Sequence, residues 1–377
     1  MDFNLYSTPL LFGFVQGLLY AVLFWLRGWR QQRLSDGLFG CLLFTFVFEI
    51  WEYMLGFGGI EILWKELEFF PRTFSLLLPP LAFFYLKSQF NTDFRFRWGD
   101  LKHALPFLVY AGYHMIVFAQ GPEFVSDWKK NVHGPFGLDF IEIGMRFASQ
   151  LIYFYWAYQL FREYQRWEPS QFSDTEAVSF DWFRNFLLAF LASNLFGWGM
   201  TLIDLWLQLD FWHDWWDELF NAALIYYLAI AGYAQLQPRK LQFSAIPNLE
   251  TSAALKSDKL SEGDLLRWKS RLENIMDDEK AYLEPELTLS DLAQRLGTNG
   301  SVLSAVVNTS FGKNFNDFVN EYRVEAVKRM LRDASNSHYS LLGIGLECGF
   351  NSKSTFNRAF KKITGFAPGD YAREEKG

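Results

Sequence analysis

Long apolar stretches alternate with short polar ones over the first 236 residues of the chain. A helix that crosses the hydrocarbon core of a bilayer needs about 20 mainly apolar residues. Stretches of that length here are apolar nearly all round, unlike the amphipathic helices of a soluble core. The pattern predicts an all-α protein in which residues 1–236 form a seven-helix transmembrane bundle. The predicted spans are Leu5–Leu26, Gly37–Phe57, Phe69–Leu86 (kinked at Pro79 and Pro80), Leu101–Ala119, Leu138–Phe161, Phe183–Leu209 and Asp217–Gln235.

Lysine and arginine are concentrated in every second loop of this region. The loops after the first, third, fifth and seventh predicted spans carry most of them. Because loops rich in these residues stay in the cytoplasm, we predict a membrane protein with its N-terminus outside and everything after Pro238 in the cytoplasm. The residues that indicate this orientation are Arg27, Arg30, Arg33, Lys87, Arg95, Arg97, Lys102, Arg162, Arg166, Arg184, Arg239 and Lys240.

The composition agrees with a membrane region. Aromatic residues make up 19% of the chain, with 15 Trp and 41 Phe, and most of them precede Pro238. Trp and Tyr commonly mark membrane interfaces. The net charge of −7 averages over two environments and therefore says little. The two cysteines, Cys41 and Cys348, provide neither a metal-binding spacing nor a disulfide framework.

The pattern changes after Pro238. Residues 237–263 contain prolines and scattered serines without convincing periodicity, which predicts a linker. Residues 264–377 are densely charged, and their apolar residues recur at helical spacing. The first helix expected there, Asp264–Met276, has an apolar stripe. The stripe either packs on its own domain or forms a contact in a homodimer.

The sequence "TLSDLAQRLGTNGSVLSAVVN" has the parts of a helix-turn-helix unit. Thr288 and Asp291 resemble a capping box at the start of a helix. Gly297 suits the left-handed position that ends it, and Asn299 can cap the second helix. Leu303, Val306 and Val307 are predicted to face the core. The predicted outer face of the second helix consists of Ser301, Ser304, Ala305 and Asn308.

The same order returns after Ser340. A helix, "LLGIGLEC", stops at Gly349, and Asn351 or Ser352 begins the next one. Phe356, Ala359, Phe360 and Ile363 share the predicted buried face of that helix. Its outer face supplies donors and acceptors for base edges and cations for phosphates. The candidate DNA-binding residues of this second unit are Ser352, Lys353, Asn357, Arg358, Lys361 and Lys362.

A long helix, "NFNDFVNEYRVEAVKRML", is predicted between the two units. From Asn299 to Tyr371 the chain resembles the DNA-binding domain of the AraC/XylS family of bacterial transcription regulators. "YRVEAVKRML" and "GFNSKSTFNRAFKKITGFAPGDY" carry the resemblance. It implies that residues 264–377 bind double-stranded DNA through two helix-turn-helix units in successive major grooves. It also implies a sensing module elsewhere in the chain, usually a soluble one.

Two positions depart from the family pattern. Ala305 stands where many relatives carry a basic residue. Gly345 replaces a small helix-forming residue, although glycine inside a helix costs about 1 kcal/mol relative to alanine. The larger departure is that membrane helices occupy the place of the sensing module.

Ionisable residues inside membrane spans are costly and often functional. Glu49, Glu52, Glu142, Arg146 and Asp204 are therefore candidates for a ligand or coupling site, with interhelical ties as the alternative. Glu142 and Arg146 are one turn apart and can pair within their helix. The sequence shows no nucleophile motif, glycine-rich phosphate loop or metal-spaced histidines. We therefore predict no enzyme activity, metal or cofactor.

The sequence thus predicts a membrane-embedded one-component regulator. Its expected partners are double-stranded DNA, the lipid bilayer and an unidentified small-molecule or envelope signal, with a homodimer left open. Two alternatives remain at this point. One is a membrane transporter or enzyme with a regulatory DNA-binding tail, and the other is a DNA-binding protein that is merely anchored in the membrane.

Overall fold

The structure is a computed structural model that describes residues 2–91, 93–174, 180–235, 261–336 and 338–374. Within these ranges the regular elements are helices, joined by one isolated antiparallel bridge between Phe172 and Thr288. The all-α prediction is confirmed. Contacts divide the chain into two units. Unit 1 comprises Met1–Phe161 and Asp181–Gln242, and unit 2 comprises Arg162–Phe180 and Phe243–Gly377.

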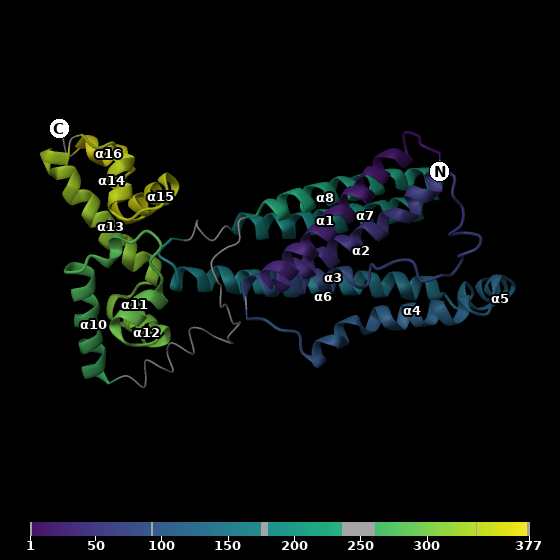
Figure 1. Ribbon diagram of the computed structural model, residues 1–377, viewed down its shortest axis with the longest axis horizontal. Coiled ribbons are helices and arrows are strands. Elements are labelled where there is room, and N and C mark those ends of the chain that lie inside the picture. The colour runs from purple at the N-terminus through teal and green to yellow at the C-terminus, as the bar shows by residue number, and fades with distance from the viewer. Residues whose placement is uncertain (1, 92, 175–179, 236–260, 337, 375–377) are drawn as a thin grey trace. The chain divides into compact units, whose positions relative to one another are not determined.

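Unit 1 consists of long helices that run lengthwise beside one another (Figure 1). The first two, α1 and α2, pack on each other and on α8, and α2 also packs on α3. Helix α6 begins in unit 1, and its last residues belong to unit 2. The helices are α1 (Ser7–Gln31), α2 (Leu34–Phe57), α3 (Leu78–Phe90), η1 (Trp98–Ala104), α4 (Leu105–Phe118), α5 (Pro122–Trp128), η2 (Lys129–His133), α6 (Leu138–Trp167), α7 (Phe180–Leu207), η4 (Phe211–Asp214) and α8 (Trp215–Ala234).

A glycine allows α1 to approach its neighbours closely. A Cβ atom at Gly17 would lie 2.3 Å from Cγ2 of Val47 on α2 and 2.7 Å from Cγ2 of Ile225 on α8. Both distances are far below van der Waals contact. Small residues at such contacts are typical of helices that associate inside membranes.

Each predicted span overlaps a helix, and the third differs most from its prediction. The third helix starts at Leu78 instead of Phe69 and is 13 residues long. Pro79 and Pro80 lie in its first turn, where proline lacks no helical hydrogen bond. The expected kink is therefore wrong, because these prolines begin the helix.

The count of seven spans is not confirmed. Among the described residues, Ser7–Gln31, Leu34–Phe57 and Asp181–Asp204 are long and apolar enough to cross a bilayer. A fourth is added if Trp98–Phe118 and Pro122–His133, between which the chain bends by 119°, count as one broken span.

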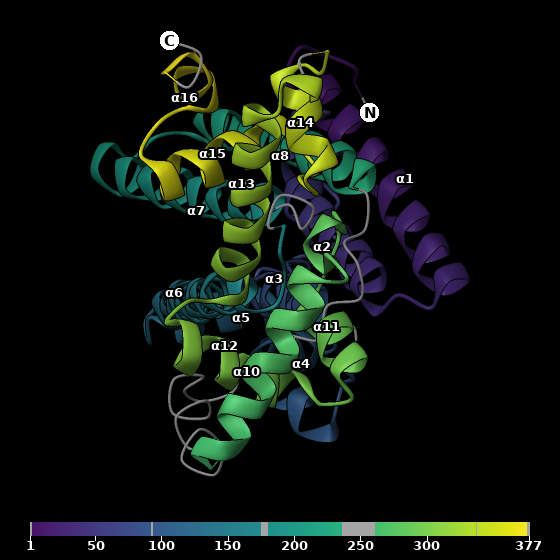
Figure 2. The ribbon, with the colours of Figure 1, turned by 90° about the vertical axis from the view of Figure 1, so that its left-hand side faces the viewer.

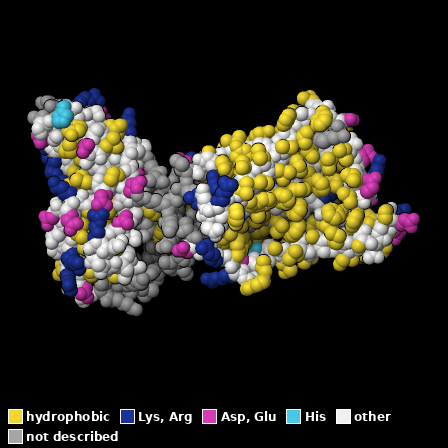
Figure 3. Space-filling model, in the orientation of Figure 1, with side chains coloured by type: hydrophobic (Ala, Val, Ile, Leu, Met, Phe, Trp, Pro, Cys, Tyr) yellow, Lys and Arg dark blue, Asp and Glu magenta, His cyan; other side chains and the backbone are white. Residues whose placement is uncertain are grey.

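Unit 1 exposes many large apolar side chains. Figure 3 shows them covering most of the visible face of this unit, with charged side chains near its two ends. Soluble monomers rarely expose apolar patches larger than a few hundred Å². The exposed residues include Phe12 and Leu19 of α1, Leu108 and Ile116 of α4, Phe140 and Leu151 of α6, and Leu195 and Trp206 of α7.

In unit 2, helix α13 connects two groups of shorter helices. Figure 2 shows α13 extending from the group α10–α12 to the group α14–α16, and α13 contacts α12, α14 and α15. The elements are η3 (Glu168–Ser170), α10 (Glu262–Asp277), η5 (Ala281–Leu283), α11 (Leu289–Leu296), α12 (Gly300–Phe311), α13 (Phe315–Arg332), η6 (Ala334–Asn336), α14 (Leu341–Glu347), α15 (Lys353–Thr364) and α16 (Pro368–Glu374).

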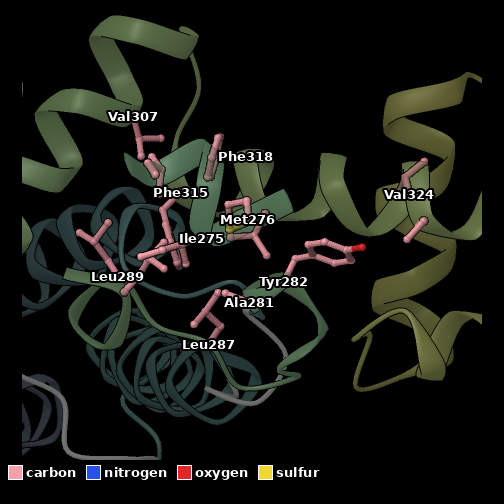
Figure 4. Packing of buried hydrophobic residues seen from close by; sticks show 14 of the residues in the cluster. Ile275, Met276, Ala281, Tyr282, Leu287, Leu289, Val307, Phe315, Phe318 and Val324 are labelled. Carbon is pink, nitrogen blue, oxygen red and sulfur yellow. The ribbon is translucent and has the colours of Figure 1, made fainter. Parts of the chain in front are cut away.

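The apolar stripe of α10 packs on its own domain. Leu272, Ile275 and Met276 are buried in the core of unit 2, and Leu265 and Trp268 pack against that core. Figure 4 shows Ile275 and Met276 among the side chains of α11, α12 and α13. Of the two interpretations of the stripe, packing within the domain is therefore confirmed. Ser261 caps α10, and the predicted linker up to residue 260 lies outside the described residues.

Candidate nucleic-acid interface

The first helix-turn-helix unit is built by the local signals in its sequence. Thr288 and Asp291 form a capping box, each accepting a 3.1 Å hydrogen bond from the other's backbone N–H. Gly297 ends α11 at φ +70°. Asn299 caps α12 by accepting a 3.0 Å hydrogen bond from the N–H of Val302. These predictions are confirmed.

The outer face of α12 is narrower than predicted. Ser301 and Asn308 are exposed and Ser304 is half-buried. Ala305, however, is only 1% exposed, so its expected place on the outer face is wrong. The reason is that α12 packs against α10, α11 and α13 together. A helix covered from three directions buries a wider face than one apolar stripe predicts.

The second unit has the same construction. Ser340 caps α14, and Ser352 caps α15 by accepting a 3.1 Å hydrogen bond from the N–H of Thr355. Phe356 and Phe360 are 1% and 0% exposed, as predicted. Between the helices, Gly349 has φ +91°, and a Cβ atom there would lie 2.4 Å from the carbonyl oxygen of Tyr282. Both conformation and space therefore require glycine at this turn.

Helix α15 presents a cationic face opposite its buried face. Lys353, Asn357, Arg358, Lys361 and Lys362 are exposed. Lys362 already has a partner, because its Nζ lies 2.6 Å from Oδ1 of Asp317 on α13. Ser352 is half-buried and serves as the cap. The arrangement offers guanidinium, ammonium and amide groups to a groove from one helix face.

The sequence analysis missed a segment of unit 2. Residues Glu168–Asp174, which we name the strap, lie between α6 and α7 in sequence and belong to the DNA-binding unit. The strap contacts Arg323 of α13, which is 0% exposed. The Arg323 guanidinium donates 2.8 Å hydrogen bonds to the carbonyl oxygens of Tyr282 and Glu284 and a 3.1 Å bond to Oγ of Ser173. Burial lowers the pKa of Arg323 to about 10.

The candidate residues of unit 1 mostly come together. Glu49, Glu52, Glu142 and Arg146 line one cavity of about 530 Å³ in unit 1. Asp204 does not line it and is exposed on α7. Two further lining residues, Asp217 and Glu218 of α8, escaped the sequence analysis because they begin the last apolar stretch and resemble interface residues.

Ion pairs and hydrogen bonds hold several of these side chains in place. Oε1 of Glu52 lies 2.7 Å from the guanidinium of Arg72. Glu49 accepts a 2.8 Å hydrogen bond from the backbone N–H of Phe74. Glu142 pairs with Nε2 of His114 on α4 at 2.8 Å, where we expected a pair with Arg146. The cavity is therefore polar and charged inside a unit with an apolar exterior.

Comparisons with known proteins concern unit 2. Residues 292–374 match a family described as a helix-turn-helix domain. The chain is 28% identical over 120 residues to an uncharacterized HTH-type transcriptional regulator, YtdP, of Bacillus subtilis. It is 30% identical over 86 residues to a putative AraC-like transcription regulator of Streptomyces lividans. No solved structure matches the chain significantly.

These matches are partial on both sides. They cover 32% of this chain and 15% of the Bacillus protein, and 23% of this chain and 27% of the Streptomyces protein. The chain therefore spans less than a third of the length of these relatives, and the family match at residues 292–374 lies within unit 2. With two capped helix pairs joined by α13, residues 292–374 form an AraC-type helix-turn-helix domain of a transcription regulator.

Proposed function

We propose that the chain is a membrane-embedded one-component transcription regulator. Unit 2 binds specific double-stranded DNA through α12 and α15, and unit 1 lies in the bacterial inner membrane and senses a signal. The observation that carries the DNA-binding half is the exposed group Lys353, Arg358 and Lys361 on a helix whose opposite face packs into the core of unit 2. Such a helix can enter a major groove without unfolding its domain.

The apolar exterior of unit 1 supports the membrane placement. Leu195 and Trp206 of α7 are 66% and 84% exposed. Water would make this surface unfavourable, whereas lipid tails are as apolar as the side chains themselves. The loop charges support an outer N-terminus and a cytoplasmic unit 2.

The polar cavity supports a sensing role. Charged groups in a membrane unit are expensive, and a plain anchor has no use for a cavity lined by Glu49, Glu52 and Arg146. The same cavity favours one alternative, a transporter with a regulatory tail. Uptake of substrates by vesicles containing the intact protein would support that alternative.

Crosslinking of the full-length protein to chromosomal DNA in cells tests the proposal. We expect enrichment of discrete sites, lost in Arg358→Ala. Arg373→Ala is the control, because Arg373 is also an exposed arginine but lies on α16, where it pairs with Asp370 at 2.6 Å. Uniform recovery of DNA by the wild type, or equal loss in both variants, would contradict specific binding through α15.

A further inference from the structure

The cavity of unit 1 has acceptor atoms that lack donors. Glu218 is 6% exposed and lines the cavity, yet its Oε2 has no hydrogen-bond partner among the described residues. Asp217 and Asn194 also line the cavity, and the Oδ1 atom of each is buried without a hydrogen-bond partner among the described residues. Buried acceptors without donors are unfavourable. The cavity is therefore suited to a ligand that brings donors.

The cavity also contains more carboxyl groups than cationic side chains. Four of its carboxyl groups have a basic side chain as partner, in the pairs Glu52–Arg72, Glu68–Lys129, Asp139–His133 and Glu142–His114. Among the described lining residues, Arg146 is the cation that remains to face Glu49, Asp217 and Glu218. A ligand that carries positive charge would offset this excess of carboxyl groups.

We propose that this cavity binds an organic amine with several N–H or O–H donors. Its volume of about 530 Å³ lies in the range of small-molecule sites. Trp64, Phe69 and Tyr110 supply aromatic wall, which attracts organic cations. The amine's role as the signal rests on the proposed function, whereas its binding does not.

Thermal unfolding of the full-length protein in detergent micelles tests this assignment. We expect spermidine or glucosamine to raise the unfolding midpoint, and glucose and citrate to leave it unchanged. Glu218→Gln should abolish the shift. Glu123→Gln should keep it, because Glu123 is exposed on α5 away from the cavity.

An equal shift with citrate, no shift with either amine, or a shift that survives Glu218→Gln would overturn the assignment. Amine binding that leaves DNA binding unchanged would support the ligand class and count against sensing. The two proposals therefore fail separately.

A second inference rests on the strap, which joins the start of the first helix-turn-helix unit. The backbone N–H of Ser173 donates to the carbonyl oxygen of Leu287 at 3.2 Å. The backbone N–H of Leu289 donates to the carbonyl oxygen of Gln171 at 2.8 Å. These bonds flank the bridge between Phe172 and Thr288. The strap therefore pairs with the residues that lead into α11.

The strap also contacts α13 through Asn316. The Asn316 side chain donates to the carbonyl oxygens of Ser173, at 2.9 Å, and Phe172, at 3.3 Å. Together with the Arg323 bond to Ser173, these contacts bury Ser173 completely. The strap thus holds α13, the helix that connects the two helix-turn-helix units.

The end of the strap reaches the start of α15. Asp174 is 5% exposed. Its Oδ2 accepts a 2.7 Å hydrogen bond from Nδ2 of Asn351, and its Oδ1 accepts a 3.3 Å bond from Oγ1 of Thr355. A helix N-terminus favours anions, and phosphates bind such positions readily. The Asp174 carboxylate therefore occupies a place that suits a DNA phosphate.

We propose that the strap is an autoinhibitory segment within unit 2. Seated, it places the chain's own carboxylate at α15 and fixes the two helix-turn-helix units to each other. Because the strap lies between α6 and α7 in sequence, a change in those helices can act on it. The regulatory part of this inference rests on the proposed function.

A crosslink in the full-length protein tests the strap. Phe172→Cys together with Thr288→Cys places two thiols at directly opposed positions, where Cβ atoms lie about 4.5–5.5 Å apart. We expect a disulfide under oxidising conditions and DNA affinity that falls at least tenfold, restored by reductant. The DNA is a duplex selected by the wild type from random sequences, and the single-cysteine variants are the controls.

Asp174→Asn provides the opposite perturbation. We expect several-fold tighter DNA binding, because the carboxylate charge at α15 is removed. Asp181→Asn is the matched control, since Asp181 is exposed and pairs with Arg184 on its own helix. A disulfide that fails to form, or forms without changing DNA affinity, would overturn the inference. Binding by Asp174→Asn no tighter than wild type would do the same, whereas a wild type that selects no duplex would contradict the proposed function instead.

Discussion

A Cβ atom at position 345 would lie 2.9 Å from Cγ of Phe356. The ring of Phe356, on α15, therefore rests directly on the backbone of α14. This contact explains why glycine stands inside a helix in which alanine would be favoured by about 1 kcal/mol.

We expect Gly345→Ala to destabilise the protein by about 1–2 kcal/mol, because overpacking costs about 1–3 kcal/mol and exceeds the gain in helix propensity. Chemical unfolding of unit 2 in the intact protein measures the change. Gly369→Ala, where nothing lies within 4 Å of the new Cβ, is the control and should not destabilise. A stabilised Gly345→Ala variant would show that the ring can move aside at little cost.

Arg358 and Lys362 should affect DNA binding differently. Arg358→Ala should lose about 1–3 kcal/mol of discrimination between the selected duplex and random DNA, as expected of a bidentate base contact. Lys362→Ala should weaken all sequences alike and flatten the salt slope by about one unit. The loss should be partly offset, since Lys362 no longer has to leave Asp317. Titrations at several salt concentrations separate the two, and identical behaviour of both variants would contradict these roles.

The strap should loosen as pH rises. Burial raises the pKa of Glu168 to about 9, nearby Asp174 adds to the rise, and Arg358 opposes it. Tyr164 also lies within electrostatic reach. A released Glu168 titrates near its ordinary value of about 4.3. The seated strap therefore holds an extra proton between these values, and its stability falls as pH increases through this window.

Hydrogen exchange at the amides of Ser173 and Leu289 measures this loosening. After correction for intrinsic rates, protection should fall between pH 5 and 9 by at most about tenfold per pH unit. Glu168→Gln should remove this dependence of protection on pH. The amide of Leu303, inside the first helix-turn-helix unit, should show no such dependence in the wild type. A pH response unchanged by Glu168→Gln would assign the effect to another group.

Neutralising Glu49 and Glu52 together should alter the response to the signal without altering DNA affinity in its absence. Both line the cavity, and neither belongs to unit 2. Reporter expression in cells, at matched protein levels, measures the response. Glu61→Gln is the control, since Glu61 is exposed and does not line the cavity. Unaltered regulation in the double variant would reduce both residues to interhelical ties.

The topology is testable with a reporter that works only in the cytoplasm. The asymmetry of lysine and arginine between loops predicts which fusions are active. Fusions after Arg33, Arg97, Glu168 and Gly377 should be active, and those after Gly59, Lys130 and Asp210 should be silent. Silence in the first set, or activity in the second, would contradict both the seven-span count and the cytoplasmic location of unit 2.

What the sequence predicted well depends on neighbouring residues. The caps at Thr288, Asn299 and Ser352 and the turn at Gly297 follow from contacts within a few positions. The burial of Ala305 does not, because it depends on packing from three other helices.

The strap was missed for a related reason. Its pairing with residues near Thr288 uses backbone groups, which leave no side-chain periodicity. Asp217 and Glu218 were missed because a position at the end of an apolar stretch does not distinguish a cavity from a membrane surface.

Unit 2 is made of two segments that are separated in the sequence, and this affects what proteolysis or gene fusion does to the domain. The segment Arg162–Phe180 is synthesised before α7 and α8, and the rest of the domain is synthesised after them. A protease acting between α8 and α10 would liberate α10–α16 without Ser173, leaving the 3.1 Å bond from Arg323 without its acceptor. The same holds for a gene fusion that transplants only the last third of the chain. A domain separated in either way lacks the segment that we propose to be inhibitory, so a chimera that keeps this regulation must carry the strap from the same parent.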